Sequence, residues 1–174
     1  SRFAARQLLL AHAALSDLSA GRLRHDQRLA RAGLGLAEAS ETDCEVQMGD
    51  WSLRRSAAGY QARFASAQGF ALALDLKTSQ PVLLQGEQGL SRKGPQPQQF
   101  SRYYSQVQLQ TAAQLELDGR PLQLQGRSWL DHEWSDSLLG EAGADKAAGW
   151  DWLGINLDDG GALTLFRLRR ADGS

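Results

Sequence analysis

Residues 70–76 read FALALDL, in which the large apolar side chains all fall on even positions. Because successive side chains of a strand point to opposite faces, this period of two predicts a β-strand with one buried face. Residues 114–117 and 122–125 alternate in the same way on either side of Asp118-Gly119. An Asp-Gly pair between alternating runs is typical of a two-residue hairpin turn, so these two segments are predicted to pair antiparallel.

Six further segments have the pattern of short strands and are separated by turns that contain Gly or Asp. They are residues 3–16, 45–54, 60–66, 103–110, 149–157 and 162–169. Residues 24–39 are interpreted as an irregular connection, because two glycines weaken a helix there. Residues 86–99 are interpreted as a long surface loop, because their glycines and prolines exclude a central strand. This spacing predicts an all-β fold, an antiparallel barrel or sandwich.

Composition and length disfavour several kinds of partner and indicate a single domain. With 19 Lys and Arg against 20 Asp and Glu, no global field draws the chain to nucleic acid or to an anionic membrane. The single cysteine, Cys44, excludes an internal disulfide. The longest apolar stretch, residues 8–15, is too short to span a membrane. We predict one domain over residues 1–174, and the two ends are expected to be cuts in a longer protein.

The richest chemistry lies in residues 129–134, which read WLDHEW. Continuing the even-numbered apolar row of the preceding strand places His132 and Trp134 toward the interior. Asp131 and Glu133 then lie on the opposite face, where they are expected to contact a second domain.

A second strand offers a partner for His132. Asp151 shares its parity with the apolar residues at 153, 155 and 157, so its carboxylate is predicted to point inward. An inward His132–Asp151 pair could shuttle a proton in an apolar cavity, which makes these two the candidate catalytic residues. The alternative is that both are satisfied buried polar groups that hold two strands together. On the face opposite that inward row, Trp150 and Trp152 are expected to contact the second domain.

Aromatic side chains could line a cavity for a flat or elongated apolar ligand. The candidates are Trp51, Tyr103, Tyr104 and Trp134, and the alternative is that they are ordinary core. No His-x-His or His-x-x-x-His spacing occurs, so no metal site is predicted. The basic run Ser91-Arg92-Lys93-Gly94 is interpreted as a solvated turn, and the alternative is an anion-binding nest with two cations. Serine-hydrolase, nucleotide and dinucleotide motifs are absent from the sequence.

Blocks along the whole chain resemble the first lipocalin-like domain of the AttH/carotenoid 1,2-hydratase (CrtC) family, often described as predicted secreted hydrolases. The blocks are residues 12–17, 28–31, 33–37, 50–53, 81–86, 90–94, 103–105, 129–135 and 149–152. The resemblance implies a protein of two tandem lipocalin-like barrels that is exported from the cytoplasm to the periplasm or envelope. It also implies, for some members, association with an ABC-type export system.

The resemblance also implies a chemistry for the enzymes of the family. Its hydratases add water to a terminal carbon–carbon double bond of an acyclic carotenoid, and they need no cofactor. His132-Glu133-Trp134 matches the His-x-Trp pattern of hydratase sites. Residues 165–168, which read LFRL, lack the tyrosine and aspartate expected on a following strand.

Three functions follow from these observations. The first is a module that binds an apolar, lipid- or isoprenoid-like ligand, which needs only a cavity with a few polar anchors. The second is a hydratase or hydrolase that uses acid/base chemistry. The third is a purely structural half of a two-domain protein. The binding module is the preferred prediction, because the proton donor that the family pattern expects is missing from residues 165–168.

Overall fold

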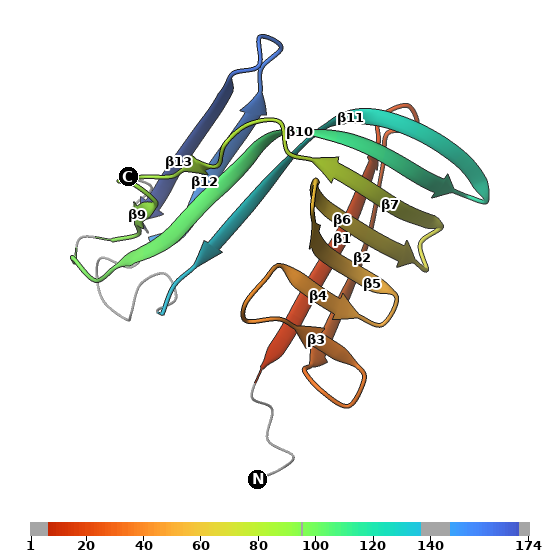
Figure 1. Ribbon diagram of the computed structural model, residues 1–174, viewed down its shortest axis with the longest axis horizontal. Helices are drawn as coiled ribbons and strands as arrows, with labels where there is room; N and C mark the ends of the chain where they lie inside the picture. The colour runs from red at the N-terminus through yellow and green to blue at the C-terminus, as the bar shows by residue number, and fades with distance from the viewer. Residues whose placement is uncertain (1–6, 95, 137–146, 171–174) are drawn as a thin grey trace. The chain divides into compact units, whose positions relative to one another are not determined.

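The computed structural model describes residues 7–94, 96–136 and 147–170 (Figure 1). The regular elements in these ranges are strands. They are β1 (Leu8–Asp17), β2 (Arg22–Arg31), β3 (Ala37–Ala39), β4 (Glu45–Met48), β5 (Trp51–Ser56), β6 (Gly59–Ser66), β7 (Phe70–Lys77), β8 (Leu83–Leu84), β9 (Leu90–Arg92), β10 (Phe100–Leu117), β11 (Arg120–Trp134), β12 (Ala147–Asn156) and β13 (Ala162–Arg170). The predicted all-β class is confirmed. In the same ranges, no helical segment is long and apolar enough to cross a bilayer.

The strands pair antiparallel in three sheets. β1 pairs with β2, β12 pairs with β13, and a nine-stranded sheet has the order β11-β10-β7-β6-β5-β4-β3, with β8 and β9 also paired to β10. This order ends in β11 and β3 without closing on itself. Of the two predicted alternatives, a sandwich fits this arrangement and a closed barrel does not.

The chain divides into two compact units. The first unit comprises Ser1–Lys77 and Thr111–Gly126, and the second comprises Thr78–Gln110 and Arg127–Ser174. Because β10 and β11 are long, each contributes one segment to each unit. The units are described separately below.

The core of the first unit lies between the β1–β2 hairpin and the β3–β7 meander, which the hairpin crosses (Figure 1). Residues 70–76 form β7, and Phe70 and Leu76 on its predicted inner face are both less than one-tenth exposed, whereas residues 71–74 are all half-buried. The buried core residues are Leu9, Ala13, Ala37, Met48, Trp51, Phe70 and Leu115. They come from strands far apart in the sequence, so apolar burial ties the hairpin to the sheet.

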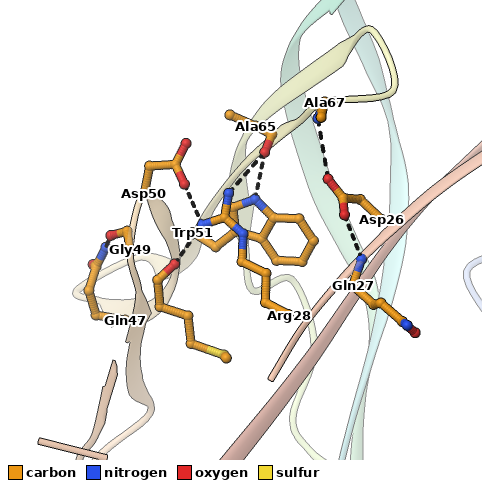
Figure 2. A network of polar contacts seen from close by, with 10 residues as sticks. Asp26, Gln27, Arg28, Gln47, Gly49, Asp50, Trp51, Ala65 and Ala67 are labelled. Atoms are coloured by element: carbon orange, nitrogen blue, oxygen red, sulfur yellow. Dashed lines mark hydrogen bonds and ion pairs between the residues drawn. The ribbon is translucent and has the colours of Figure 1, made fainter. Parts of the chain in front are cut away.

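Trp51 is the largest side chain in this core and is 2% exposed. Its indole N–H donates to the Ala65 carbonyl at 2.7 Å, and its ring meets Phe64 edge to face. The Arg28 guanidinium lies 4.4 Å from the centre of the ring (Figure 2). It also donates to the Met48 and Ala65 carbonyls and pairs with Asp50. Arg28 on β2 therefore fixes the hairpin over β5 and β6 by stacking and by charge-assisted hydrogen bonds.

A second arginine, Arg24 on β2, links this strand to two turns of the first unit. The Arg24 side chain, 7% exposed, donates to both carboxylate oxygens of Asp118 at 2.6 and 2.5 Å and to the Gln68 carbonyl at 3.0 Å. Gly69 leaves room for this clamp, because a Cβ there would lie 2.8 Å from Asp118 Oδ1. The clamp joins β2 to the β6–β7 turn and to the β10–β11 turn. Asp118 therefore has a tertiary role beyond its turn preference.

These ion pairs predict that acid destabilises the protein. Hydrogen bonds from Arg24 and Arg28 hold the pKa values of Asp118 and Asp50 below the ordinary 3.8. A carboxyl whose pKa is lower in the folded state contributes stability above pH 3.8, and that stability is lost as pH falls through the folded pKa. We expect urea unfolding midpoints to be constant from pH 7 to 5 and to fall below pH 4.

The Asp118→Asn variant is the control for this prediction. It removes one titrating group, so its midpoint should be lower at pH 7 and should change less with pH below 4. Because Asp118 is largely exposed, high salt should reduce the difference. If the urea midpoints of wild type and Asp118→Asn change equally with pH, the acid sensitivity does not come from the Asp118 carboxyl.

Two segments differ from their sequence interpretations. Residues 24–39 are not an irregular connection, since most of them form β2 and β3. Their alternation is masked by arginines at 24, 28 and 31, and β2 is specified by pairing with β1 along its whole length. Residues 86–99 include β9, which pairs with β10. Of the segment predicted as residues 3–16, positions 3–6 lie outside the described residues.

Candidate ligand-binding site

The second unit carries a groove beside the first half of β10. Its volume is about 180 Å³. It is lined by Leu84, Gln88, Gly89, Leu90, Arg102, Tyr103, Tyr104 and Trp134. The pairing of β8 and β9 with β10 places Leu84 and Leu90, and the Tyr103 N–H donates to the Gly89 carbonyl at 2.9 Å. Three of the four aromatic residues proposed for a ligand cavity therefore lie together.

An aromatic cluster adjoins this groove. Tyr104 on β10 contacts two residues of β11: its hydroxyl lies 3.0 Å from His132 Nδ1, and its ring meets Trp134 edge to face at 6.4 Å. The rings of His132 and Trp134 are 5.0 Å apart. The Tyr104 hydroxyl and the His132 imidazole can each donate or accept a hydrogen bond. The cluster thus offers exchangeable protons at the edge of an apolar surface.

A polar network occupies the opposite face of the same strands. Asp131 accepts hydrogen bonds from the Ser105 hydroxyl and the Trp129 indole, both at 2.6 Å. Ser105 is fully buried and also accepts a bond from the Gln85 amide at 2.9 Å. Because Asp131 accepts at least two hydrogen bonds, these donors stabilise its carboxylate where it lies.

Tyr103 extends this network to β12. Its hydroxyl accepts a bond from the Trp152 indole at 3.0 Å, and Trp152 packs edge to face on Trp129. Burial raises the pKa of the Tyr103 hydroxyl, which therefore stays protonated at neutral pH. In Figure 1 the β12–β13 hairpin lies beside this half of β10, as these contacts require.

A buried lysine lies at the end of the network. The Lys93 side chain is 8% exposed, and its ammonium lies 2.5 Å from Glu133 and 4.1 Å from the centre of the Phe166 ring. Glu133 also accepts a bond from the buried Ser101 hydroxyl. Glu133 and the aromatic ring together compensate a cation that burial alone would disfavour.

The predicted assignment of the two faces at residues 129–134 is reversed. All four residues are exposed, but Asp131 and Glu133 bond to the buried hydroxyls of Ser105 and Ser101. His132 and Trp134 instead contact each other and Tyr104 on the opposite face. The prediction extended an apolar row from Leu122 and Leu124, but these side chains are 41% and 45% exposed and do not mark a core face.

The structure does not bring His132 and Asp151 together. Asp151 is exposed and pairs with Arg169 of the neighbouring strand at 3.3 Å, while His132 bonds to Tyr104. Trp51 belongs to the core of the first unit and does not line the groove. Of the residues expected to meet a second domain, Trp150 is 56% exposed and Trp152 is 43% exposed.

A larger hollow of about 350 Å³ lies in the first unit. Its lining combines apolar side chains, among them Phe64, Leu72, Leu115 and Leu122, with the polar residues Asp50, Arg63, Gln114, Glu116 and Gln123. Charges of both signs and several amides make this surface less suited to an apolar ligand than the aromatic groove. It also contains none of the predicted site residues.

Sequence reasoning missed Lys93, Ser105 and Gln108. A basic run between glycines is usually solvated, and nothing local indicates that Lys93 becomes buried. Ser105 and Gln108 lie in a strand with polar residues at both parities, so alternation does not assign a face to them. The uninterrupted run of buried residues from 105 to 109 follows from tertiary packing.

Comparison with known proteins supplies a family and two structural relatives. The AttH-like family model matches residues 1–174. A crystal structure of a candidate AttH from Nitrosomonas europaea is similar over 100% of this chain, with 46% identity and a TM-score of 0.89. Kievitone hydratase from Nectria haematococca is similar over 95% of this chain, with 10% identity and a TM-score of 0.67. The chain covers 53% of each of these two proteins. The comparison with curated proteins gives no significant match.

The antiparallel sheets and the likeness to the Nitrosomonas europaea structure define an all-β protein of the lipocalin-like class. The chain belongs to the AttH-like family, because the family model spans its entire length. The predicted family resemblance is thereby confirmed. At 10% identity, the likeness to kievitone hydratase shows a common fold only.

Proposed function

We propose that this chain binds an apolar, lipid- or isoprenoid-like ligand in the groove beside β10. The observation that carries the proposal is a groove lined by Tyr104, Trp134, Leu84 and Leu90. His132 adjoins it, because its imidazole bonds to the Tyr104 hydroxyl. Ligand sites are typically apolar depressions with a few polar groups that fix orientation. Here the apolar walls bury the ligand and the Tyr104–His132 pair provides the polar anchor.

The size of the groove limits what it holds. Its 180 Å³ is below the roughly 300–1,000 Å³ of sites that enclose a whole drug-sized ligand. The groove therefore accepts one end of a longer molecule, with the remainder lying outside it. A linear isoprenoid or acyl chain has this shape, and a hydroxyl at its end could bond to Tyr104 or His132.

Binding can be tested with all-trans-retinol, an isoprenoid alcohol whose uptake quenches tryptophan fluorescence. We expect saturable quenching that decreases in Trp134→Phe. Tyr104→Phe and His132→Gln should each weaken binding about 2–10-fold, because one hydrogen bond contributes about 0.5–1.5 kcal/mol. The Trp150→Phe variant is the matched control and should bind as wild type. Unsaturable quenching, or equal quenching in Trp134→Phe, would argue against the groove.

A second candidate function is hydration of an alkene, favoured by the Tyr104–His132 hydrogen bond at an apolar surface. In this reaction a protonated His132 donates its proton to one alkene carbon, and water adds to the resulting carbocation and releases a proton to solvent. The addition of a proton and a water molecule as described uses no cofactor. His132→Gln should abolish water addition to an acyclic isoprenoid alkene and change retinol affinity only a few-fold. Equal turnover in wild type and His132→Gln would exclude this role.

We also propose that the complete protein is exported to the periplasm or envelope, carries a second lipocalin-like domain and associates with an ABC-type export system. The support is the family to which the chain belongs and the 53% of each structural relative that the chain covers. Cell fractionation of the tagged full-length protein tests the location. Recovery in the cytoplasm alone would contradict export.

A further inference from the structure

Gln108 has an unusual backbone conformation for a residue inside a strand. Its φ is 53°, and within the described residues it is the one non-glycine position inside a strand with a positive φ. Residues other than glycine adopt this conformation at an energetic cost, so the surrounding structure must hold it in place. A strand residue in the left-handed region is typical of a β-bulge, which inserts one extra residue into one strand of a pair.

The contacts of β10 with β11 show that such an insertion is present. Asp118 and Gly119 both have positive φ, which defines a two-residue hairpin turn that places Leu117 opposite Arg120. In a regular antiparallel ladder, each step back along β10 from Leu117 corresponds to one step forward along β11 from Arg120. This pairing would place Tyr104 opposite Glu133. The side chain of Tyr104 instead contacts His132.

Ser105 shows the same displacement. Regular counting would place it opposite His132, but its hydroxyl bonds to Asp131. Because side chains on one face of a pair lie opposite each other or two residues apart, both contacts require a shift of one residue between the turn and Ser105. The bond of Ser101 to Glu133 fits an extra residue on β10 and not on β11. Gln108 lies between Ser105 and the turn and has the conformation that this residue needs.

The Gln108 side chain is 5% exposed and makes hydrogen bonds that hold the bulge. Its amide nitrogen donates to the Leu157 and Gly161 carbonyls at 2.8 and 2.6 Å, and its amide oxygen accepts from Arg127 at 3.2 Å. Its backbone N–H donates to the Asn156 side chain at 2.9 Å, and its carbonyl accepts from Ser79 at 2.6 Å. The same bonds fix the turn between β12 and β13 against β10.

We propose that Gln108 is the positioning residue of the candidate site: its bulge sets the register that places Tyr104 opposite His132. The inference deepens the proposed ligand-binding function and rests on it for its biological meaning. The positive φ of residue 108 is what forms the bulge and so sets the register. The hydrogen bonds of the Gln108 amide offset the energy that a non-glycine residue needs to adopt this φ.

Two variants separate the backbone from the side chain. Gln108→Gly removes the amide but adopts a positive φ freely, whereas Gln108→Val removes the amide and disfavours a positive φ. The readout is the ¹⁵N resonance of the His132 imidazole, which responds to its hydrogen bond and is assigned by its loss in His132→Gln. Tyr104→Phe gives the reference signal for His132 without its partner. The Trp51 indole N–H signal reports whether the first unit is folded, and the Trp152 indole N–H signal does so for the second unit, which holds residue 108 and His132.

We expect Gln108→Gly to keep the wild-type His132 signal and Gln108→Val to show the Tyr104→Phe signal, with the Trp51 and Trp152 indole signals of a folded protein present in both. Retinol affinity should fall at least as far in Gln108→Val as in Tyr104→Phe. A wild-type His132 signal in Gln108→Val, or its loss in Gln108→Gly, would overturn the proposal. If Gln108→Val lacks the Trp51 or the Trp152 indole signal, Gln108→Ala takes its place with the same expected results. The imidazole readout needs no ligand, so failure of retinol binding in the wild type is a separate result.

Discussion

Replacing Trp51 by alanine is expected to lower the free energy of unfolding by about 3–5 kcal/mol, the usual cost of deleting a large buried aromatic side chain. Trp51 is 2% exposed and contacts Phe64, Arg28 and the Ala65 carbonyl. Because domains are stable by only about 5–15 kcal/mol, this loss is a large fraction of the total free energy of unfolding. Urea denaturation followed by circular dichroism measures it.

Trp150→Ala is the matched control, since it removes the same side chain from a position that is 56% exposed. Its unfolding free energy should stay within about 0.5 kcal/mol of wild type. Trp51→Phe should fall between the two, because it keeps most of the apolar volume but loses the indole N–H bond. Equal losses in Trp51→Ala and Trp150→Ala would contradict a core centred on Trp51.

Placing a charge in the groove is expected to reduce retinol affinity at least tenfold. Leu90 is 46% exposed and forms part of the groove wall, so Leu90→Glu should fold normally. Burial of a leucine side chain against a ligand contributes about 1.5–3 kcal/mol, and each 1.4 kcal/mol changes affinity tenfold. The measurement is the same fluorescence titration as for the wild type.

Leu163→Glu is the control for this charge. Leu163 is 50% exposed on β13 and does not line the groove, so its variant should bind retinol as wild type does. If both leucine variants lose affinity equally, the added charge acts through the whole molecule and the groove assignment is wrong.

The sequence predicts the all-β fold well because local patterns carry it. Alternation at residues 70–76 predicts β7 and its buried face. The Asp118-Gly119 pair predicts the β10–β11 turn, and both residues have the positive φ that a two-residue turn requires. β2 was missed because arginines at positions 24 and 28 look polar in the sequence, while their long side chains reach inward to Asp118 and over Trp51.

The candidate site was predicted only in part. Tyr103, Tyr104 and Trp134 could be recognised as aromatic residues of strands that share a groove. The faces of residues 129–134 could not, because period-two reasoning needs a reliable core residue and Leu122 is half exposed. The bulge at Gln108 has no glycine or proline to mark it, since side-chain bonds to distant carbonyls hold it.

Photolabelling with a diazirine-bearing farnesol analogue tests the central claim most directly. On irradiation, the probe should attach to the peptides that carry Leu84–Leu90 and Trp134, and excess unlabelled farnesol should suppress this labelling. Leu90→Glu should show much weaker labelling than Leu163→Glu. Labelling confined to the hollow of the first unit, at residues 63–65 and 71–73, or labelling that farnesol does not suppress, would contradict an apolar-ligand site beside β10.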